Sequence, residues 1–201
     1  MNQSETPFRL VGGRLALDFV NTTDWSSDGE AVLDKLATIG DVRRWTEAAG
    51  LGPAVGAKLS HDLPALLDFR LQLRNVLLAA MDGSAPSPGA LARLNEALAS
   101  GGGLRMAGKR LLPAGSLRWL VSVSAMALFG EPRDMARLRM CPGHDCGWLF
   151  VDESRNGRRR WCTMATCGNR EKARRHYAGR KIKEDEGGAP PRDLKTGRAR
   201  T

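Results

Sequence analysis

The chain has 201 residues, 42 % of them hydrophobic, and a formal net charge of +9 at pH 7. This length is sufficient for one domain with a buried core and a small additional module. No apolar stretch approaches the ~20 residues that span a bilayer, and no export signal follows Met1, so we expect a cytoplasmic protein without membrane association.

The first predicted element is a β-hairpin. Residues 8–11 and 14–19 flank Gly12-Gly13, which suits a two-residue turn. Leu15, Leu17 and Phe19 alternate with Arg14, Ala16 and Asp18, so one face of the second strand is apolar. A polar group follows, and it consists of Asp18, Asn21 and Thr22. These side chains are candidates to hold a small-molecule ligand, although capping of a turn is the alternative that we favour.

The region that follows is predicted to be mostly helical. Apolar periodicity and capping residues predict helices over 30–39, 41–49, 53–59, 62–81, 87–100 and 116–129. Asp41 is the expected N-cap of the second helix, and Gly50 is expected just beyond its C-terminus. Two strands are expected over 104–106 and 109–112, and one over 137–140. The predicted fold class is therefore α+β: a mostly helical N-terminal domain with a small β-hairpin, followed by a separate metal-binding module.

The four cysteines lie in two short-spaced pairs. Cys141 and Cys146 form one C-x4-C pair, and Cys162 and Cys167 form a second one after fifteen residues. Each pair can turn two sulfurs toward a common centre, which is the arrangement of a structural tetrahedral zinc site. Iron is the main alternative metal in that geometry, and two disulfides are the alternative without a metal. One Zn²⁺ with these four ligands is the prediction.

The residues between and after the pairs predict further structure. Residues 148–151 and 158–161 resemble two strands joined by the turn Ser154-Arg155-Asn156-Gly157. Asn169 is a candidate N-cap for a helix after the last cysteine, in which Ala173, Tyr177 and Ile182 are expected to pack inward. Trp148 and Trp161 are expected to pack against the N-terminal domain. This order of loop, hairpin, loop and helix is that of a treble-clef zinc finger.

The short sequence motifs of this segment are also informative. GWLFVD, SRNGRRRWC, TMATC and CGNR, in this order, resemble the CGNR-type zinc fingers at the C-terminus of bacterial proteins with an N-terminal ABATE domain. The match covers about residues 138–180, and LALDFVNT at Leu15–Thr22 carries a shorter N-terminal one. The resemblance implies a stress-related transcription regulator. His144, inside the first cysteine loop, departs from the pattern and could compete as a ligand, but an exposed loop position is the favoured interpretation.

Positive charge is concentrated in the finger. Residues 1–137 contain 15 Lys and Arg against 14 Asp and Glu, residues 138–182 contain 11 against 4, and residues 183–201 contain 5 against 4. About two cations are explained by the charge of a metal tetrathiolate, and the excess favours a polyanionic partner, with DNA preferred. The candidate nucleic-acid-binding residues are Arg155, Arg158, Arg159, Arg160, Arg170, Lys172, Arg174, Arg175 and Lys181. For Arg170, a hydrogen bond to the first cysteine loop is an equal alternative.

These observations divide the chain into an N-terminal domain (1–137), a finger (138–182) and a tail (183–201) that lacks apolar periodicity and is expected to be disordered. His61 and His176 stand alone, and no phosphate-binding loop is present, so we expect no enzyme. The predicted function is transcription regulation, with DNA bound by the finger and a ligand or partner sensed by the N-terminal domain. A zinc-braced module for protein or RNA binding is the alternative. The oligomeric state stays open, and a homo-oligomer is compatible with the sequence.

Overall fold

The structure is a computed structural model of the chain and describes residues 8–26, 28–52, 55 and 62–186. The elements from the N-terminus are α1 (Leu15–Val20), β1 (Thr23–Trp25), β2 (Ala31–Asp34), α2 (Ile39–Ala48), α4 (Leu63–Asp82), α5 (Pro88–Ala99), β3 (Gly102–Ala107) and β4 (Arg110–Gly115). They are followed by α6 (Leu117–Phe129), α7 (Pro132–Ala136), β5 (Leu138–Met140), β6 (Leu149–Val151), the π-helical turn η2 (Met164–Gly168) and α8 (Asn169–Glu186). The α+β fold class, with a cysteine cluster at the C-terminal end, is confirmed.

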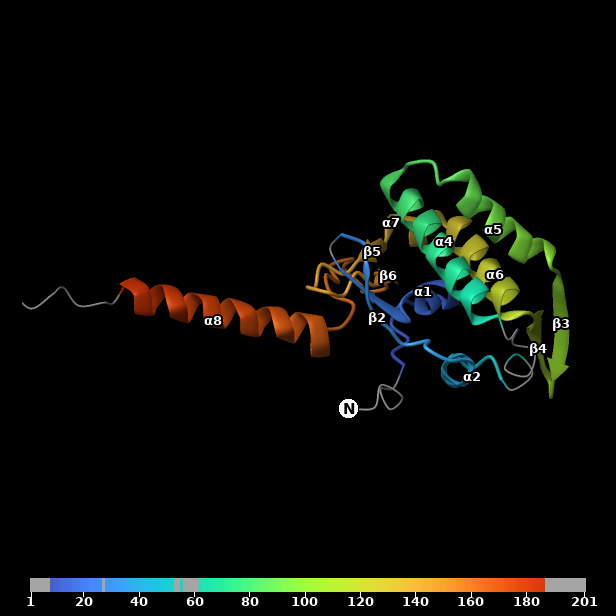
Figure 1. The fold of residues 1–201 in the computed structure, drawn as a ribbon, viewed down its shortest axis with the longest axis horizontal. Coiled ribbons are helices and arrows are strands. Elements are labelled where there is room, and N and C mark those ends of the chain that lie inside the picture. Colours follow the sequence, from blue (N-terminus) through green and yellow to red (C-terminus); the bar gives the residue numbers. More distant parts are fainter. Residues whose placement is uncertain (1–7, 27, 53–54, 56–61, 187–201) are drawn as a thin grey trace, which may run out of the picture.

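The core of the N-terminal region is a helical layer in which α4 packs on α5, α5 on α6, and α1 on both α4 and α6 (Figure 1). Three of these helices begin at the caps that the sequence indicates. Asp62, Ser87 and Ser116 each accept a hydrogen bond from a backbone N–H in the first turn. Gly83 ends α4 in the left-handed conformation (φ 68°). The helices predicted over 62–81, 87–100 and 116–129 are therefore confirmed.

The expected strand over 14–19 is wrong, because Leu15–Val20 form the helix α1. Ala16, Leu17, Phe19 and Val20 are all fully buried, so the segment is apolar on nearly every side. A short apolar run of this kind does not distinguish a buried strand from a buried helix by its periodicity. Gly12-Gly13 leads into α1 and does not close a hairpin.

The helix expected over 30–39 is also wrong. Ala31–Asp34 form β2, which pairs antiparallel with β1. The following helix α2 begins later, at Ile39, because Thr38 and Asp41 form a reciprocal capping box. Asp41 is thus the third residue of that helix and not its N-cap, whereas Gly50 follows it with φ 70° as expected. The helix expected over 53–59 lies outside the described residues, apart from Val55.

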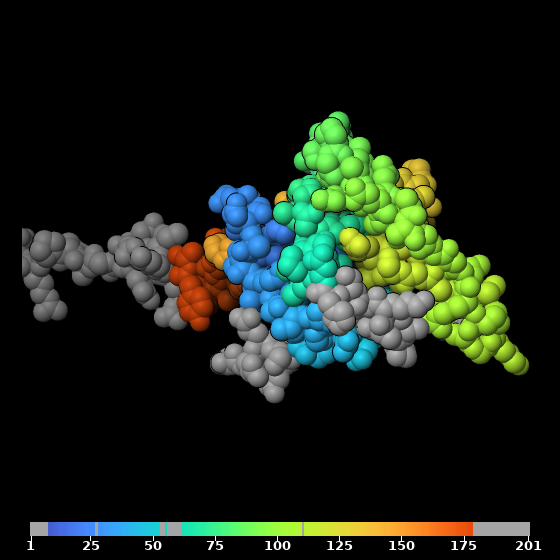
Figure 2. Space-filling view, turned by 45° about the vertical axis from the view of Figure 1, so that its right-hand side comes forward, coloured from blue at the N-terminus to red at the C-terminus, as the bar shows by residue number. Residues whose placement is uncertain are grey.

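The strands predicted near 104–112 form the hairpin β3–β4, in register from Gly102 with Gly115 to Ala107 with Arg110. Figures 1 and 2 show this hairpin at the opposite end of the molecule from α8. The helix α8 extends away from the body of the molecule after the last cysteine (Figure 1). Lys183–Glu186, predicted as the start of a disordered tail, continue α8, and residues 187–201 lie outside the described residues.

The β-hairpin expected between the two cysteine pairs is wrong. β6 is present, but it pairs with β5, which precedes the first cysteine, and residues 158–161 form no strand. The predicted turn is there, because the N–H of Gly157 donates to the carbonyl of Ser154 at 3.1 Å with φ 62° at Gly157. β5 and β6 thus flank the first cysteine loop. Of the predicted treble-clef order, the two cysteine loops and the helix are present, and the hairpin between the loops is not.

Candidate metal centre and basic surface

The first cysteine loop is closed by its own backbone. The N–H of Cys141 donates to the carbonyl of Trp148 at 2.8 Å, and the N–H of Cys146 donates to the carbonyl of Gly143 at 3.2 Å. A Cβ at position 143 would lie 2.9 Å from the sulfur of Cys167, so only glycine lets the loop approach the second pair this closely.

The second pair is placed by η2. Thr163 caps this turn by accepting from the N–H of Thr166 at 3.1 Å, and α8 continues from it without a break. Asn169 has helical dihedrals, so the prediction that it caps α8 is wrong; the capping residue is Thr163, at the start of the η2 turn that leads into α8. A Cβ at Gly168 would lie 2.6 Å from the sulfur of Met164, which explains the glycine of the CGNR segment.

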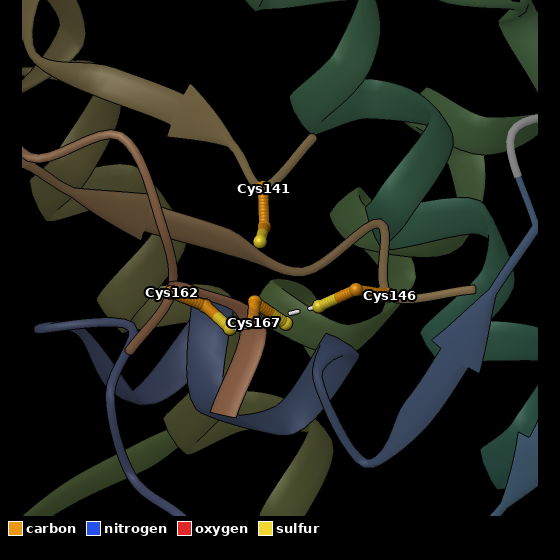
Figure 3. Close-up of side chains that lie close together, drawn as sticks. All are labelled: Cys141, Cys146, Cys162 and Cys167. Carbon is orange, nitrogen blue, oxygen red and sulfur yellow. Dashed lines mark hydrogen bonds between the residues drawn. The ribbon is translucent and has the colours of Figure 1, made fainter. Parts of the chain in front are cut away.

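The four sulfurs converge as the spacing predicts (Figure 3). All lie within 4.8 Å of one another, with 3.6 Å between Cys146 and Cys162 and 3.5 Å between Cys162 and Cys167. Tetrahedral Zn–S bonds of about 2.3 Å require sulfurs about 3.8 Å apart. Each cysteine is buried, while His144 is exposed and its ring faces Asp145. The donor set therefore fits one structural zinc ion, and His144 is not part of it.

The four thiols lie close enough together for their ionisation to be coupled. Hydrogen bonds from Cys146 and Cys162 lower the pKa of the Cys141 thiol, and the hydrogen bond with Cys141 raises the pKa of Cys146. Four buried thiols so close together cannot all be ionised unless a positive ion lies between them.

A buried arginine lies beside this cluster. Arg74, on α4, donates to the carbonyl of Gly147 at 2.9 Å and lies over the ring of Trp25 at 4.3 Å. Within the described residues it pairs with no carboxylate, and burial lowers its pKa to about 10, which the charge of Cys146 partly offsets. Four thiolates around a divalent ion carry a formal charge of about −2. Arg74 is thus placed to balance the charge of the metal centre.

Sequence reasoning missed Arg74, although a signal existed. Arg70 and Arg74 occupy the apolar stripe of α4 at positions i and i+4, and both are buried. A cation at such a position requires a specific partner inside the protein. For Arg70 that partner is Asp34, together with the hydroxyl of Thr22 at 2.9 Å. For Arg74 the described partners are the carbonyl of Gly147 and the ring of Trp25, both next to the cysteine cluster.

The finger is joined to the N-terminal region by many buried hydrogen bonds. Trp148 donates to the carbonyl of Thr23 at 3.1 Å and to Asp24 at 2.8 Å, which confirms that this tryptophan packs against the N-terminal part. The N–H of Trp25 donates to the carbonyl of Cys146 at 3.1 Å. Trp161 instead packs against the cysteine cluster, where Arg160 lies over its ring.

The three candidate ligand-binding residues have internal partners. Asp18 accepts from the N–H of Gly12 at 2.8 Å, and its burial raises its pKa to about 6. Asn21 exchanges two hydrogen bonds with the backbone of Leu149, both at 2.8 Å. The hydroxyl of Thr22 donates to the carbonyl of Phe19 at 2.7 Å. None of the three lines the three cavities described for this part of the chain; their polar atoms bond to the backbone of the fold.

Among the candidate nucleic-acid-binding residues, Arg159 differs from its neighbours. Its guanidinium lies over Phe150 at 4.2 Å and donates to the carbonyls of Val11 at 2.9 Å and of Cys162. Arg158 and Arg160 are exposed. The chain thus turns one arginine of the triplet inward as a brace and two outward.

The other candidates lie on the outer surface. Arg155 is exposed on the turn, and Arg170, Lys172, Arg174 and Arg175 are exposed on α8. Arg174 and Arg175 both pair with Glu171. Arg170 is 3.5 Å from the carbonyl of His144, so it reaches the first cysteine loop. Lys181 lies in α8, but the direction of its side chain is not among the described features.

The inward packing expected for α8 is wrong for two of its three residues. Ala173 and Tyr177 are exposed, and 68 % of Tyr177 is accessible to solvent. The side chain of Ile182 lies outside the described features. From Lys172 to Ala178, every side chain of α8 is exposed, so no described part of the chain covers this helix.

The sequence models of two protein families match the chain. The CGNR zinc finger matches residues 137–180. ABATE, described as "Putative stress-induced transcription regulator", matches residues 13–138. None of the curated proteins is similar enough to the chain to count as a match. No helix in the described part of the chain is both long and apolar enough to cross a bilayer. With an ABATE region that fills most of the chain and a cysteine cluster that fits zinc, the protein belongs to the ABATE family and carries a C-terminal CGNR zinc finger.

Proposed function

We propose that this protein regulates transcription in the cytoplasm by binding duplex DNA through a basic surface. This surface consists of the exposed cations of the finger: Arg155, Arg158, Arg160, Arg170, Lys172, Arg174 and Arg175. The N-terminal domain senses a ligand or partner, and the protein acts by binding and not as an enzyme. The reduced, metal-type cysteine cluster is consistent with the cytoplasm.

The observation that carries the proposal is the position of α8. An isolated helix is only marginally stable in water, and helices in proteins normally bury one face. α8 begins directly after the cysteine cluster and then leaves the body of the molecule (Figure 1). All its described side chains from 172 to 178 are exposed. A helix of this diameter fits the major groove of B-DNA, and its cations can reach the flanking phosphates.

The outward arginines extend the same surface. Arg158 and Arg160 follow the turn after β6, and Arg160 is held over Trp161 at 4.9 Å next to the cysteine cluster. Because Cys162 follows directly, the metal centre fixes both the start of α8 and the end of this segment. Cations on two rigid segments can therefore contact phosphates on two sides of a groove.

The test is the salt dependence of binding to duplex DNA. Contact with four or five phosphates predicts that log K falls with log[salt] at a slope near −4, from about −0.9 per phosphate. Two double variants, Arg158→Gln/Arg160→Gln and Lys172→Gln/Arg175→Gln, should each reduce the slope by about 2. Arg43→Gln/Arg118→Gln removes the same charge from exposed positions of α2 and α6 and should leave the slope unchanged.

The exposed Tyr177 on α8 favours a second candidate, a zinc-braced module for protein or RNA binding. In that case the finger variants would leave duplex DNA affinity unchanged and would weaken binding to single-stranded RNA or to a protein partner. Absence of any salt-dependent binding to duplex DNA by the zinc-loaded protein would overturn the DNA proposal.

A further inference from the structure

A cavity of about 270 Å³ lies in the N-terminal domain between α6 and the β3–β4 hairpin. Its walls come from four parts of the fold: the start of α1, the turn after α2, the two strands, and one face of α6. Leu15, Leu51, Leu112, Leu120 and Val123 are among the apolar residues that line it. The hairpin forms the end of the molecule opposite α8, so this cavity is remote from that helix (Figure 2).

The lining combines hydrocarbon with one cation. Arg105 is the only charged residue among the described residues that line the cavity. It lies directly opposite Leu112 in the β3–β4 register, so both side chains are on the same face of the hairpin. Its guanidinium reaches the turn after α2, 3.6 Å from the position that a Cβ of Gly52 would occupy. No described carboxylate forms an ion pair with it.

A second polar group is available in the cavity. The hydroxyl of Ser124, on α6, accepts a hydrogen bond from the N–H of Ala16 at 3.1 Å. A hydroxyl that accepts one bond still has its own proton to donate. Within the described residues that proton has no acceptor, so a ligand oxygen could take it.

We propose that this cavity binds a small carboxylic acid with an aromatic or branched apolar body. The carboxylate pairs with the guanidinium of Arg105 and accepts from Ser124, and the apolar body fills the space between α6 and β4. The volume of about 270 Å³ is slightly below the range of about 300–1,000 Å³ that ligand pockets occupy, so the ligand is small. The inference rests on the sensing role proposed above for the N-terminal domain, and supplies its site and ligand class.

Charge and solvation favour this class over neutral or purely apolar ligands. A half-buried guanidinium beside hydrocarbon has lost part of its hydration without gaining a counter-ion. The planar guanidinium matches the two oxygens of a carboxylate, and such charge-assisted bonds are about twice as strong as neutral ones. Water binds weakly in a cavity with apolar walls, so an apolar ligand body displaces few tightly bound water molecules. A carboxylic acid supplies both requirements at once.

Isothermal titration of the full-length, zinc-loaded protein with phenylacetate, without DNA, tests the proposal. We expect saturable binding, with phenylacetamide at least tenfold weaker because it lacks the charge. Arg105→Gln should weaken phenylacetate binding at least tenfold, and Arg118→Gln, an exposed arginine of α6 outside the cavity, should have no effect. Ala127→Leu, which fills the cavity, should abolish binding and leave the protein folded by circular dichroism.

Two results would overturn the inference. One is equal affinity of the wild-type protein and Arg105→Gln for phenylacetate. The other is no binding of phenylacetate, benzoate or isovalerate by a protein whose zinc content and circular dichroism are intact. Because no DNA is present, either failure leaves the salt-dependence test of the basic surface unaffected.

Discussion

The side-chain amide of Asn21 pairs with the backbone of Leu149 as a neighbouring strand would. Its Nδ2 donates to the carbonyl of Leu149 at 2.8 Å, and its Oδ1 accepts from the N–H of the same residue at 2.8 Å. Asn21 caps the C-terminal end of α1, and Leu149 begins β6, so this pair joins the ABATE region to the finger inside the core. The N–H of Val151 continues the joint by donating to the carbonyl of Gly12 at 2.9 Å.

The first prediction concerns this pair. Asn21→Ala would leave the N–H and carbonyl of Leu149 buried without partners, which costs about 2–4 kcal/mol of unfolding free energy. Urea unfolding followed by circular dichroism measures the loss. Asn95→Ala, at an exposed position of α5, is the matched control and should change little. A variant Asn21→Ala as stable as the control would show that the joint contributes nothing.

The second prediction concerns Arg74 and the metal. Replacement of residues that support metal ligands typically lowers metal affinity by about 10- to 100-fold. We expect Arg74→Gln to weaken zinc binding by that factor, because the charge next to Cys146 is lost. Arg74→Lys keeps the charge and should lose less. Competition with a chromogenic chelator measures both, and unchanged affinity in Arg74→Gln would argue against charge compensation.

The third prediction is a pH dependence at Asp18. Burial raises the pKa of Asp18 from 3.8 to about 6, so ionisation opposes folding and this contribution to stability is lost as pH rises from about 4 to about 6. Asp18→Asn stays neutral at every pH. The stability difference between Asp18→Asn and the wild type should therefore grow in favour of the variant from about pH 4 to about pH 6, and change little above that.

Urea unfolding in zinc-containing buffer at several pH values measures that difference. Loss of zinc at acid pH affects both proteins equally and cancels in the comparison. A difference that is the same at pH 5 and pH 7 would contradict the raised pKa of Asp18.

The fourth prediction separates the three consecutive arginines. Arg159→Ala should destabilise the protein, because its guanidinium braces the carbonyls of Val11 and Cys162 and covers Phe150. Arg158→Ala should leave unfolding unaffected and weaken DNA binding with a reduced salt slope. Thermal unfolding and DNA titration of both variants, side by side, distinguish the two roles. Identical behaviour of the two variants would contradict the inward placement of Arg159.

Several features follow from local rules and were predictable from the sequence. Asp62, Ser87 and Ser116 are each followed by apolar residues at helical spacing, so the sequence predicts the helices α4, α5 and α6. The cysteine cluster was predictable because C-x4-C pairs restrict each pair of sulfurs to one side of a loop. In these cases the residues that determine the structure are close together in the chain.

The wrong predictions concern segments whose conformation depends on residues far away in the sequence. The sequence of residues 158–161 is compatible with a strand paired to β6, but in the structure β6 pairs with β5. The side chain of Arg159 instead turns inward and donates a hydrogen bond to the carbonyl of Val11. α1 is too short to show its period, and its conformation is fixed by burial against α4 and α6. The role of Arg74 depends on a metal centre more than sixty residues further along the chain.

The central claim is that four thiolates hold one zinc ion and thereby fix the start of α8. X-ray absorption at the zinc edge, on protein purified in reducing buffer, tests it most directly. The account predicts about one zinc per chain with four sulfur neighbours at about 2.3 Å. Protein without bound metal, an iron-filled site, or a zinc shell containing nitrogen or oxygen would contradict it.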